Sequence, residues 1–520
     1  MNAQALLNML RQRWPNSASS ESRERLTLEL EPNSLIAAVR LLNSEGAWLS
    51  GIIAEEMPSG MALGYPFLPA EGPPWIELRV IAHGASTPSV ASICFGADWQ
   101  EREIEDLFEL RFVGHPLLGD FVLHNEEWPE GMAPMRRAFD VHHAFPRHEN
   151  PLYRPPKIVH APGAFTMTVG PVYSDVVEAA QFQLETIGEE IISTRPRFFY
   201  KYRGLEKLAE KQDAWRAVLL AERLNGTSAV AHALACTAAL ETIGGCQPTP
   251  RARRLRVVAA ELERLRSHTA TIAAICKSTG LSVPTNHAYT LLESLLRLSG
   301  EYFGHRYLFG FVVPGGVSLD LADADLLALT RCATDAAAVL ARLGEGLSFD
   351  NSFLDRIEEV GIIAADEASR HGLLGPVGRA SARAGMDLRR RAPYADYASL
   401  PPHEITENEG DGYARLRVFL AEAAESARLI AQATATMLEG PIATAWQPAA
   451  GCALGWSEAP AGAAVQWLRL DADGRVARWR ILPPAFVNWH AFHLAAENFA
   501  FQDFPITLAT VGLSVAEADR

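Results

Sequence analysis

Cysteine is scarce in this chain, and the cysteines lie far apart. The 520 residues contain six, no two closer than ten residues, at positions 94, 236, 246, 276, 332 and 452. This spacing excludes a Cys-x-x-Cys metal site and a dense disulfide framework. Cys236 and Cys276 stand in apolar helical surroundings, which is typical of small core residues. A reducing compartment is the simplest inference.

Long hydrophobic runs and an excess of positive charge are also missing. No run of about 18 or more uncharged apolar residues occurs, so no membrane span is predicted. The formal net charge of −15 disfavours nucleic acid as a partner, because phosphate binding needs concentrated Lys and Arg. If the protein works at a membrane, another subunit must hold it there.

Apolar sequence is plentiful, and its pattern divides the chain. A hydrophobic content of 48% over 520 residues predicts two to four domains. In residues 1–125, the ranges 25–30 and 75–82 alternate like half-buried strands, 33–42 is helical, and an acidic amphipathic helix begins near Asp98. This order predicts a small α+β domain with helices on one face of an antiparallel sheet.

Residues 126–160 are rich in Pro, His and charge and have no sustained period, so they predict an extended linker. His142, His143 and His148 lie in this segment. Without Cys or carboxylates at ligand spacing, a solvated linker is preferred over a metal site. A second domain is predicted over 161–520.

The second domain opens with strand patterns and then becomes helical. Strands are predicted over 165–173, 182–188 and 191–197, and a hairpin over 465–470 and 476–481. Apolar residues at three and four spacing predict helices over 212–243, 250–278, 284–304, 321–347 and 413–438. The fold class is therefore α+β, with a helical bundle that carries peripheral strands.

Motifs in both regions resemble known families. The segment from Asp98 to Phe108, with Phe112-Val-Gly-His-Pro116 and Glu126 to Arg137, resembles the 30-kilodalton subunit of complex I. Tyr202-Arg-Gly-Leu-Glu-Lys207, residues 250–268 and Gly375-Pro-Val-Gly-Arg-Ala-Ser381 resemble the complex I 49-kilodalton subunit and the nickel-iron hydrogenase large subunit. The resemblance implies a fusion of two subunits, which is typical of group 4, formate-hydrogenlyase-like hydrogenases.

This chain departs from the hydrogenase pattern at the metal ligands. The four positions that the resemblance assigns to thiolates carry Asn225, Ser228, Ser514 and Glu517. Nickel and iron need four soft thiolates, which a hydroxyl, an amide and a carboxylate do not replace. We therefore expect no metal on this chain and no hydrogen turnover. Structural hydrogen bonding is the preferred role of these residues.

The complex I resemblance implies a quinone cavity at the same place. That family addresses the quinone through a His in a Gly-Pro-x-His turn and a Tyr after its Arg-x-Asp, and this chain carries Tyr173 and Gly226 there. One hypothesis is a re-equipped pocket with Tyr173, Asn225, Gly226 and Ser228 as cofactor-binding residues and Tyr202 nearby. The alternative is that both Tyr hydroxyls satisfy backbone groups.

Charged residues form the remaining candidates. Glu261, Arg264 and His268 fall at i, i+3 and i+7 and share a helix face. They form either a structural ion network, the preferred interpretation, or part of a proton relay. The same undecided group contains Glu206, Glu222, Arg223, His232, Arg379 and Asp387. Glu458 is a candidate for lining the cavity near the C-terminus. The candidate catalytic residues are Tyr173, Tyr202, His232 and Glu261.

The leading functional hypothesis is the fused large subunit of a membrane-bound, complex I-related redox complex without a nickel-iron centre. The resemblance implies a cytoplasmic position on the inner face of the cell membrane. It also implies a small iron-sulfur hydrogenase-like subunit, a ferredoxin-like iron-sulfur subunit and membrane ion-translocating subunits as partners. Electrons from partner clusters would reach a quinone or another acceptor, and this transfer would drive ion translocation. The alternative is a non-catalytic scaffold between the iron-sulfur and membrane subunits.

Overall fold

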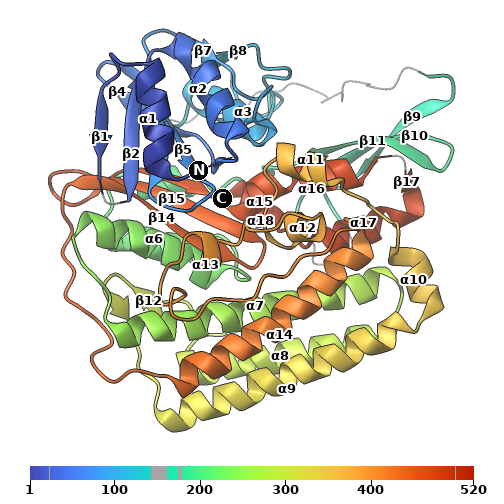
Figure 1. Cartoon of the computed structure of the whole chain (residues 1–520). Coiled ribbons are helices and arrows are strands. Elements are labelled where there is room, and N and C mark those ends of the chain that lie inside the picture. The colour runs from blue at the N-terminus through green and yellow to red at the C-terminus, as the bar shows by residue number, and fades with distance from the viewer. Residues whose placement is uncertain (23, 130, 141, 143–160, 174–177, 498) are drawn as a thin grey trace.

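The computed structural model describes residues 1–520 except 23, 130, 141, 143–160, 174–177 and 498 (Figure 1). In Figure 1 the N-terminal sheet lies at the top, a second sheet crosses the middle and long helices form the base. Much of the predicted linker, including His143 and His148, lies outside the described residues. Within the described part of the chain, no helix combines the length and the apolar character that a bilayer crossing requires.

The N-terminal region is built on a mixed six-stranded sheet in the order β1-β2-β6-β5-β3, with β4 paired to β5. Its elements are α1 (Ala3–Arg13), β1 (Ser19–Glu21), β2 (Arg25–Leu30), α2 (Pro32–Ser44), β3 (Trp48–Leu49), β4 (Ile53–Met57), β5 (Gly60–Leu68), β6 (Trp75–Ala82), β7 (Ser86–Pro88), η1 (Phe95–Ala97), α3 (Asp98–Phe108) and β8 (Arg111–Val113). The predicted strands and helices are confirmed as β2, β6, α2 and α3. The prediction of an antiparallel sheet is wrong for β2 and β6, which pair in parallel because α2 and β3 to β5 form a crossover between them.

The second region opens with a four-stranded sheet in the order β17-β11-β10-β9. Its strands are β9 (Ala164–Val169), β10 (Gln181–Ile187), β11 (Glu190–Arg197) and β17 (Phe499–Ala500). Short helices then lead into the helical part, namely α4 (Leu205–Ala209) and α5 (Ala214–Ala221). The predicted strands over 165–173, 182–188 and 191–197 correspond to β9, β10 and β11.

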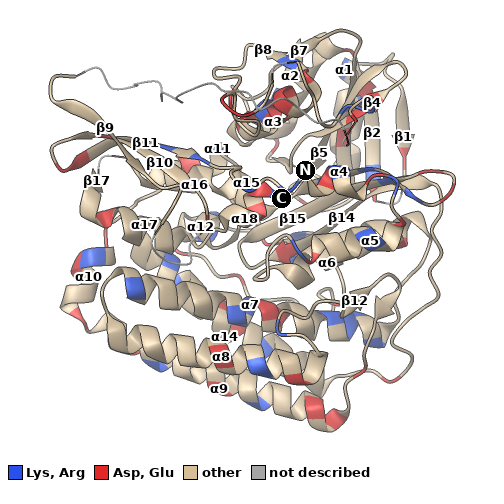
Figure 2. Ribbon diagram, turned by 180° about the vertical axis from the view of Figure 1, so that it is seen from behind, with Lys and Arg blue, Asp and Glu red and all other residues tan. Residues whose placement is uncertain are grey.

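Long helices make up the base of the molecule. They are α6 (Ala229–Ile243), α7 (Pro250–Ser278), α8 (Ser282–Phe303), α9 (Asp323–Ser348) and α14 (Gly412–Ala435), and α7 packs against α8 and α14. Figure 2 shows acidic and basic residues interspersed along α7, α8, α9 and α14. The predicted single helix over 212–243 is wrong, because a turn at Asn225 and Gly226 separates α5 from α6. The Asn225 side chain accepts a hydrogen bond from the Thr227 N–H at 3.1 Å, which stabilises this turn.

A three-stranded antiparallel sheet crosses the middle of the molecule in the order β14-β15-β16. The predicted hairpin is confirmed as β15 (Gly462–Leu470) and β16 (Val476–Leu482), whereas β14 (Gly451–Ala459) was not predicted. The remaining elements are β12 (Val312–Val313), β13 (Gly316–Val317), α10 (Asn351–Ile357), α11 (Ala365–Arg370), α12 (Gly375–Ala380), α13 (Leu388–Arg391), α15 (Pro484–Asn488), α16 (His490–Ala495), η2 (Phe501–Asp503), α17 (Phe504–Val511) and α18 (Val515–Asp519).

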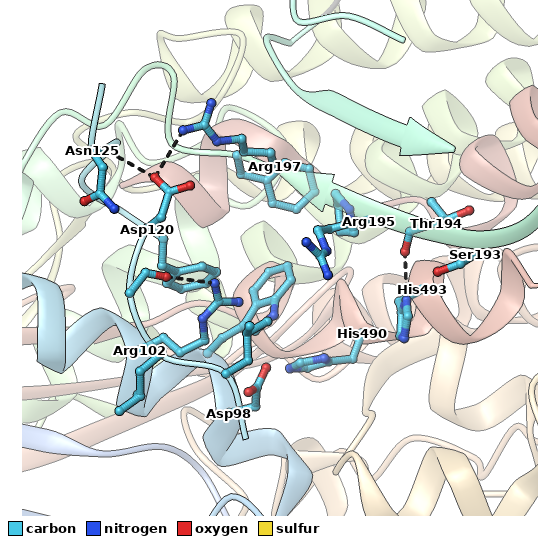
Figure 3. A pocket seen from close by; sticks show the side chains of 17 residues that line it. Asp98, Arg102, Asp120, Asn125, Ser193, Thr194, Arg195, Arg197, His490 and His493 are labelled. Atoms are coloured by element: carbon cyan, nitrogen blue, oxygen red, sulfur yellow. Dashed lines mark hydrogen bonds and ion pairs between the residues drawn. The ribbon is translucent and has the colours of Figure 1, made fainter. Parts of the chain in front are cut away.

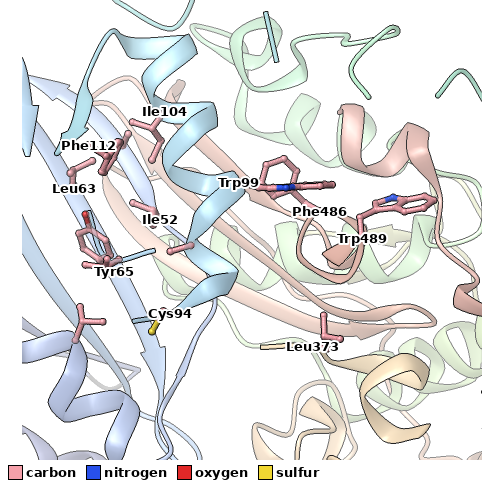
Figure 4. Packing of buried hydrophobic residues seen from close by; sticks show 14 of the residues in the cluster. Ile52, Leu63, Tyr65, Cys94, Trp99, Ile104, Phe112, Leu373, Phe486 and Trp489 are labelled. Atoms are coloured by element: carbon pink, nitrogen blue, oxygen red, sulfur yellow. The ribbon is translucent and has the colours of Figure 1, made fainter. Parts of the chain in front are cut away.

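One apolar cluster joins the two regions. It contains Leu63, Tyr65 and Ile104 of the N-terminal region together with Phe486 and Trp489 of the C-terminal helices (Figure 4). A second cluster fills the bundle formed by α6, α7, α9 and α14. The N-terminal region is thus packed on the second region through shared core side chains. The helices and strands together confirm the predicted α+β fold class.

Candidate functional site

The site lies where the start of α6 meets α18 at the C-terminal end. The first turn of α6 has free N–H groups, and the Glu263 carboxylate of α7 accepts two of them, from Val230 at 2.7 Å and Ala231 at 3.0 Å. Burial raises the pKa of Glu263 to about 7, although Arg266 and the two N–H groups oppose this rise. A carboxylate from a neighbouring helix therefore anchors the start of α6.

Ser228, His232 and Glu517 form a closed cluster. The Ser228 hydroxyl donates to Glu517 Oε1 at 2.6 Å, and His232 Nε2 lies 2.8 Å from the same oxygen. Glu517 Oε2 accepts the Ala485 N–H at 3.3 Å. The three side chains are 2%, 0% and 1% exposed, so water does not compete for these bonds. Since Oε1 accepts from both neighbours, His232 Nε2 carries a hydrogen.

Ser514 and Asn225, the other two expected ligand positions, both accept hydrogen bonds from backbone N–H groups. The Ser514 hydroxyl caps α18 by accepting the Glu517 N–H at 3.2 Å, and it donates to Glu178 Oε1 at 2.7 Å. Glu178 also accepts the Ala516 N–H at 3.1 Å. Asn225 holds the turn before α6. Glu178 was not identified from the sequence.

A nickel-iron centre does not fit this donor set. The four positions supply two hydroxyls, an amide and a carboxylate, and Ser228 and Glu517 already satisfy each other. Within the described residues, no three His, Cys, Asp or Glu side chains are arranged to hold a metal ion.

Tyr307 covers Gly226, the position where the complex I family has a tyrosine. A Cβ atom at Gly226 would lie 3.1 Å from the Tyr307 ring, so a larger side chain would need this ring to move. Arg266 lies 5.0 Å from the Tyr307 ring centroid and donates to the Gly226 carbonyl at 2.9 Å. Tyr307 was not identified from the sequence, because its side chain reaches the turn from the distant segment after α8.

Tyr173 and Tyr202 belong to other surroundings. The Tyr173 hydroxyl donates to the Ala180 carbonyl at 2.8 Å, and burial raises its pKa. Among the described residues, no hydrogen bond joins Tyr173 to Asn225 or Gly226. Burial also raises the pKa of Tyr202, and the charges of Glu103 and Glu206 add to this effect.

Tyr202 therefore lies beside an ion cluster that joins the two regions of the chain. The buried members are Glu103, Glu206, Arg478, Arg480 and Arg520. Arg480 bonds Glu103 at 2.7 Å and Glu206 at 3.3 Å. Its Nε also donates to the Ile52 carbonyl at 3.0 Å, which connects β16 to the N-terminal region. This arrangement gives Tyr202 a place in the interface between the domains.

Glu261 lies in a separate buried network between α7, α14 and β14. The ionisable members are Glu261, Arg264, His268, Arg379, Asp387, Arg389, Glu422 and Glu458. Arg389 bonds Glu261 at 3.0 Å and Asp387 at 2.6 Å, and Arg379 bonds Glu422 at 2.6 Å. The predicted helix face is thus real, and Glu422 and Arg389 are the partners that complete it.

This network contains one more carboxyl group than arginines. Three guanidinium groups face four carboxylates, which leaves a net charge of −1 when His268 is neutral. Burial, followed by the charge of Asp387, raises the pKa of Glu458. Burial also disfavours the charged form of Glu422, but Arg379 and His268 outweigh it and hold that pKa low. Glu458 is therefore the carboxyl group of this network whose pKa lies above its ordinary value.

Two bonds connect the network to the Ser228–His232–Glu517 cluster. Ser457, next to Glu458 on β14, donates to the Ala231 carbonyl at 2.7 Å. Gln466 of β15 donates to the His232 carbonyl at 3.1 Å. The start of α6 is thus held between the two groups of titratable residues.

Two protein-family models match the chain. The model described as respiratory-chain NADH dehydrogenase, 30 Kd subunit, matches residues 28–144, and the corresponding 49 Kd subunit model matches residues 279–450. The chain is 28% identical to hydrogenase-4 component G of Escherichia coli (strain K12), over 99% of this chain and 92% of that protein. It is 26% identical to formate hydrogenlyase subunit 5 of the same strain, over 96% and 90%. It is 29% identical to the carbon monoxide-induced hydrogenase of Rhodospirillum rubrum, over 68% of this chain and 99% of that protein.

Proposed function

Because this chain fuses a 30-kDa-type and a 49-kDa-type region of the complex I family, we propose that it is the large subunit of a membrane-associated, hydrogenase-like redox assembly. In this role it couples electron transfer in its partners to ion translocation and has no nickel-iron centre of its own. The partners are a small hydrogenase-like iron-sulfur subunit, a ferredoxin-like iron-sulfur subunit and membrane ion-translocating subunits. They hold the chain at the cytoplasmic face of the membrane.

The closed Ser228–His232–Glu517 cluster carries this proposal. It replaces the metal ligands with groups that exchange protons and not electrons. Within the described residues, His232 Nδ1 is buried and has no hydrogen-bond partner, so it can accept a proton without breaking an existing bond. Negative charge arriving nearby favours binding of a proton at this nitrogen.

The Glu261 network supports the same role. Burial raises the pKa of Glu458 and lowers the pKa of His268, so burial favours the uncharged form of both groups. The bonds of Ser457 and Gln466 connect β14 and β15 to the start of α6. A shift in α6 on protonation of His232 would therefore act on the side chains around Glu458.

Two of the residues predicted to hold a quinone have contacts within the chain that weigh against this role. The Tyr173 hydroxyl donates its hydrogen to the Ala180 carbonyl, and the Tyr307 ring covers Gly226. We therefore place the electron acceptor on a partner subunit and not on this chain.

Glu517→Gln tests the proposal because it keeps an acceptor oxygen and removes the charge. In the purified assembly, we expect the partner clusters to be reduced at an unchanged rate, while fewer ions are translocated per electron. Glu345→Gln makes the same chemical change at an exposed position on α9 and should alter neither quantity.

The scaffold alternative predicts a different result. If the cluster only maintains the fold, Glu517→Gln assemblies that remain intact will translocate ions normally, and the coupling proposal fails. Stoichiometric nickel on this chain, measured by elemental analysis, would also overturn it.

A further inference from the structure

A cavity of about 540 Å³ lies between the N-terminal and second regions, away from the site described above (Figure 3). Side chains of α3, the segment from Leu117 to Asn125, β11 and α16 line it. One wall is aromatic, with the Trp99 ring 5.4 Å from that of Phe121 and 5.7 Å from that of Phe198. Its size is in the range of pockets for small organic ligands.

Two guanidinium groups in this cavity are incompletely paired. Within the described part of the chain, Arg195 has no ion pair or side-chain hydrogen bond, and Figure 3 shows it among the lining residues. Arg102 donates to the Gly119 carbonyl at 3.4 Å, and its buried Nε has no partner among the described residues. Burial lowers the pKa of Arg102, and the nearby charge of Arg195 contributes in the same direction.

The carboxylates of the cavity already have partners. Asp98 pairs with His115 at 3.1 Å, and Asp120 pairs with Arg197 at 3.2 Å. Asp98 is also close enough to Arg102 to favour its charged form. Arg195 is therefore the lining cation that lacks a counterion among the described residues.

His490 adds a buried polar atom to the same wall. The side chain is only 6% exposed, and its Nε2 has no partner in the described structure. Its ring lies 4.9 Å from that of Trp99. Burial lowers the pKa of His490 to about 3, so the imidazole is neutral and can donate or accept a hydrogen bond.

We propose that this cavity binds a small organic anion. Its carboxylate or phosphate group lies against Arg195 and Arg102, and its apolar body lies against Trp99. Binding supplies the counterion that Arg195 lacks and a partner for His490 Nε2. This proposal does not depend on the coupling function above.

The test uses two probes, each titrated into the purified chain and into the assembled complex. Binding of 4-fluorobenzoate is followed by fluorine NMR, and binding of phenyl phosphate is followed by calorimetry. We expect saturable binding in both preparations, and the tighter probe identifies the head group. Arg195→Gln should weaken binding by about tenfold or more, while Arg195→Lys should retain part of the affinity.

Arg297→Gln is the matched control, because this arginine on α8 is 77% exposed and lies outside the cavity. Equal weakening by Arg195→Gln and Arg297→Gln would show general charge attraction and overturn the proposal. Failure of both probes to saturate would also overturn it. If a probe binds the purified chain but not the complex, the occupant of the cavity is an acidic side chain of a partner, and the small-anion proposal is overturned.

Discussion

Arg389→Met should destabilise the protein strongly, because Arg389 holds two buried carboxylates at once. Its guanidinium bonds Glu261 at 3.0 Å and Asp387 at 2.6 Å, and it is 1% exposed. Breaking one buried ion pair from one side costs roughly 3–5 kcal/mol. Since Met leaves both carboxylates without this partner, we expect a loss of about 5 kcal/mol in the free energy of unfolding.

The loss should depend on pH. Burial opposes the ionisation of Glu261, but the charges of Arg389 and Arg264 outweigh burial and hold its pKa below the ordinary value. This depressed pKa gives stability that is present above the unfolded pKa and is lost as the pH falls through the folded pKa. Without Arg389, burial dominates and the carboxyl protonates more readily. The difference between native protein and variant should therefore be larger at pH 8 than at pH 5.

Thermal unfolding followed by circular dichroism at both pH values measures the effect. For a chain of this size, a loss of about 5 kcal/mol corresponds to a decrease in Tm of roughly 5–10 °C. Arg297→Met is the control, because its pair with Glu293 lies on the exposed surface, where solvent screening leaves it little effect on stability. Equal effects of the two substitutions, or the same loss at pH 5 and pH 8, would refute the reasoning.

Three further predictions concern the surroundings of α6. The Glu263→Gln variant should gain stability relative to the native protein, by up to about 3 kcal/mol, as the pH rises from about 4.5 to 7. The reason is that the raised pKa of Glu263 makes its ionisation unfavourable in the folded protein. A difference in Tm between variant and native protein that is constant with pH would contradict this. Gly226→Ala should cost about 1 kcal/mol by pressing on Tyr307, and Tyr307→Ala in the same chain should remove that cost in a double-mutant cycle. Ser228→Ala should cost about 1–2 kcal/mol in denaturant unfolding, since Glu517 loses one donor in a buried site, and an unchanged midpoint would show that this bond contributes nothing.

Local pattern predicted the long elements well. The apolar residues of α7 and α14 recur over many turns, and β2 and β6 alternate clearly. β14 was not predicted, because its Gly- and Ala-rich sequence has little strand preference. Its conformation is determined by pairing with β15. The parallel pairing of β2 and β6 is likewise set by residues between them that carry no local sign of it.

The candidate site was predicted only in outline. The spacing of Glu261 and His268 predicts that they share a helix face. Their partners Ser426 and Glu422 lie at i+4 and i on α14, and this spacing was a signal that could have identified them. Glu178, Tyr307 and Glu263 reach the start of α6 or α18 from distant segments, so no spacing rule indicates them. The position of Tyr202 in the interface between the regions depended on tertiary packing in the same way.

The ion cluster around Arg480 has a consequence for the fused architecture. Glu103 of the N-terminal region and Arg480 of the second region are both buried, and apolar side chains of both regions share one core. Two separate polypeptides with these contacts would form an obligate pair, since each alone would expose unpaired charge and apolar surface to water. Covalent fusion raises the effective concentration of the two regions but supplies none of these contacts. Fusion therefore ensures equal amounts and rapid association of the two regions, while the interface itself determines how they fit together.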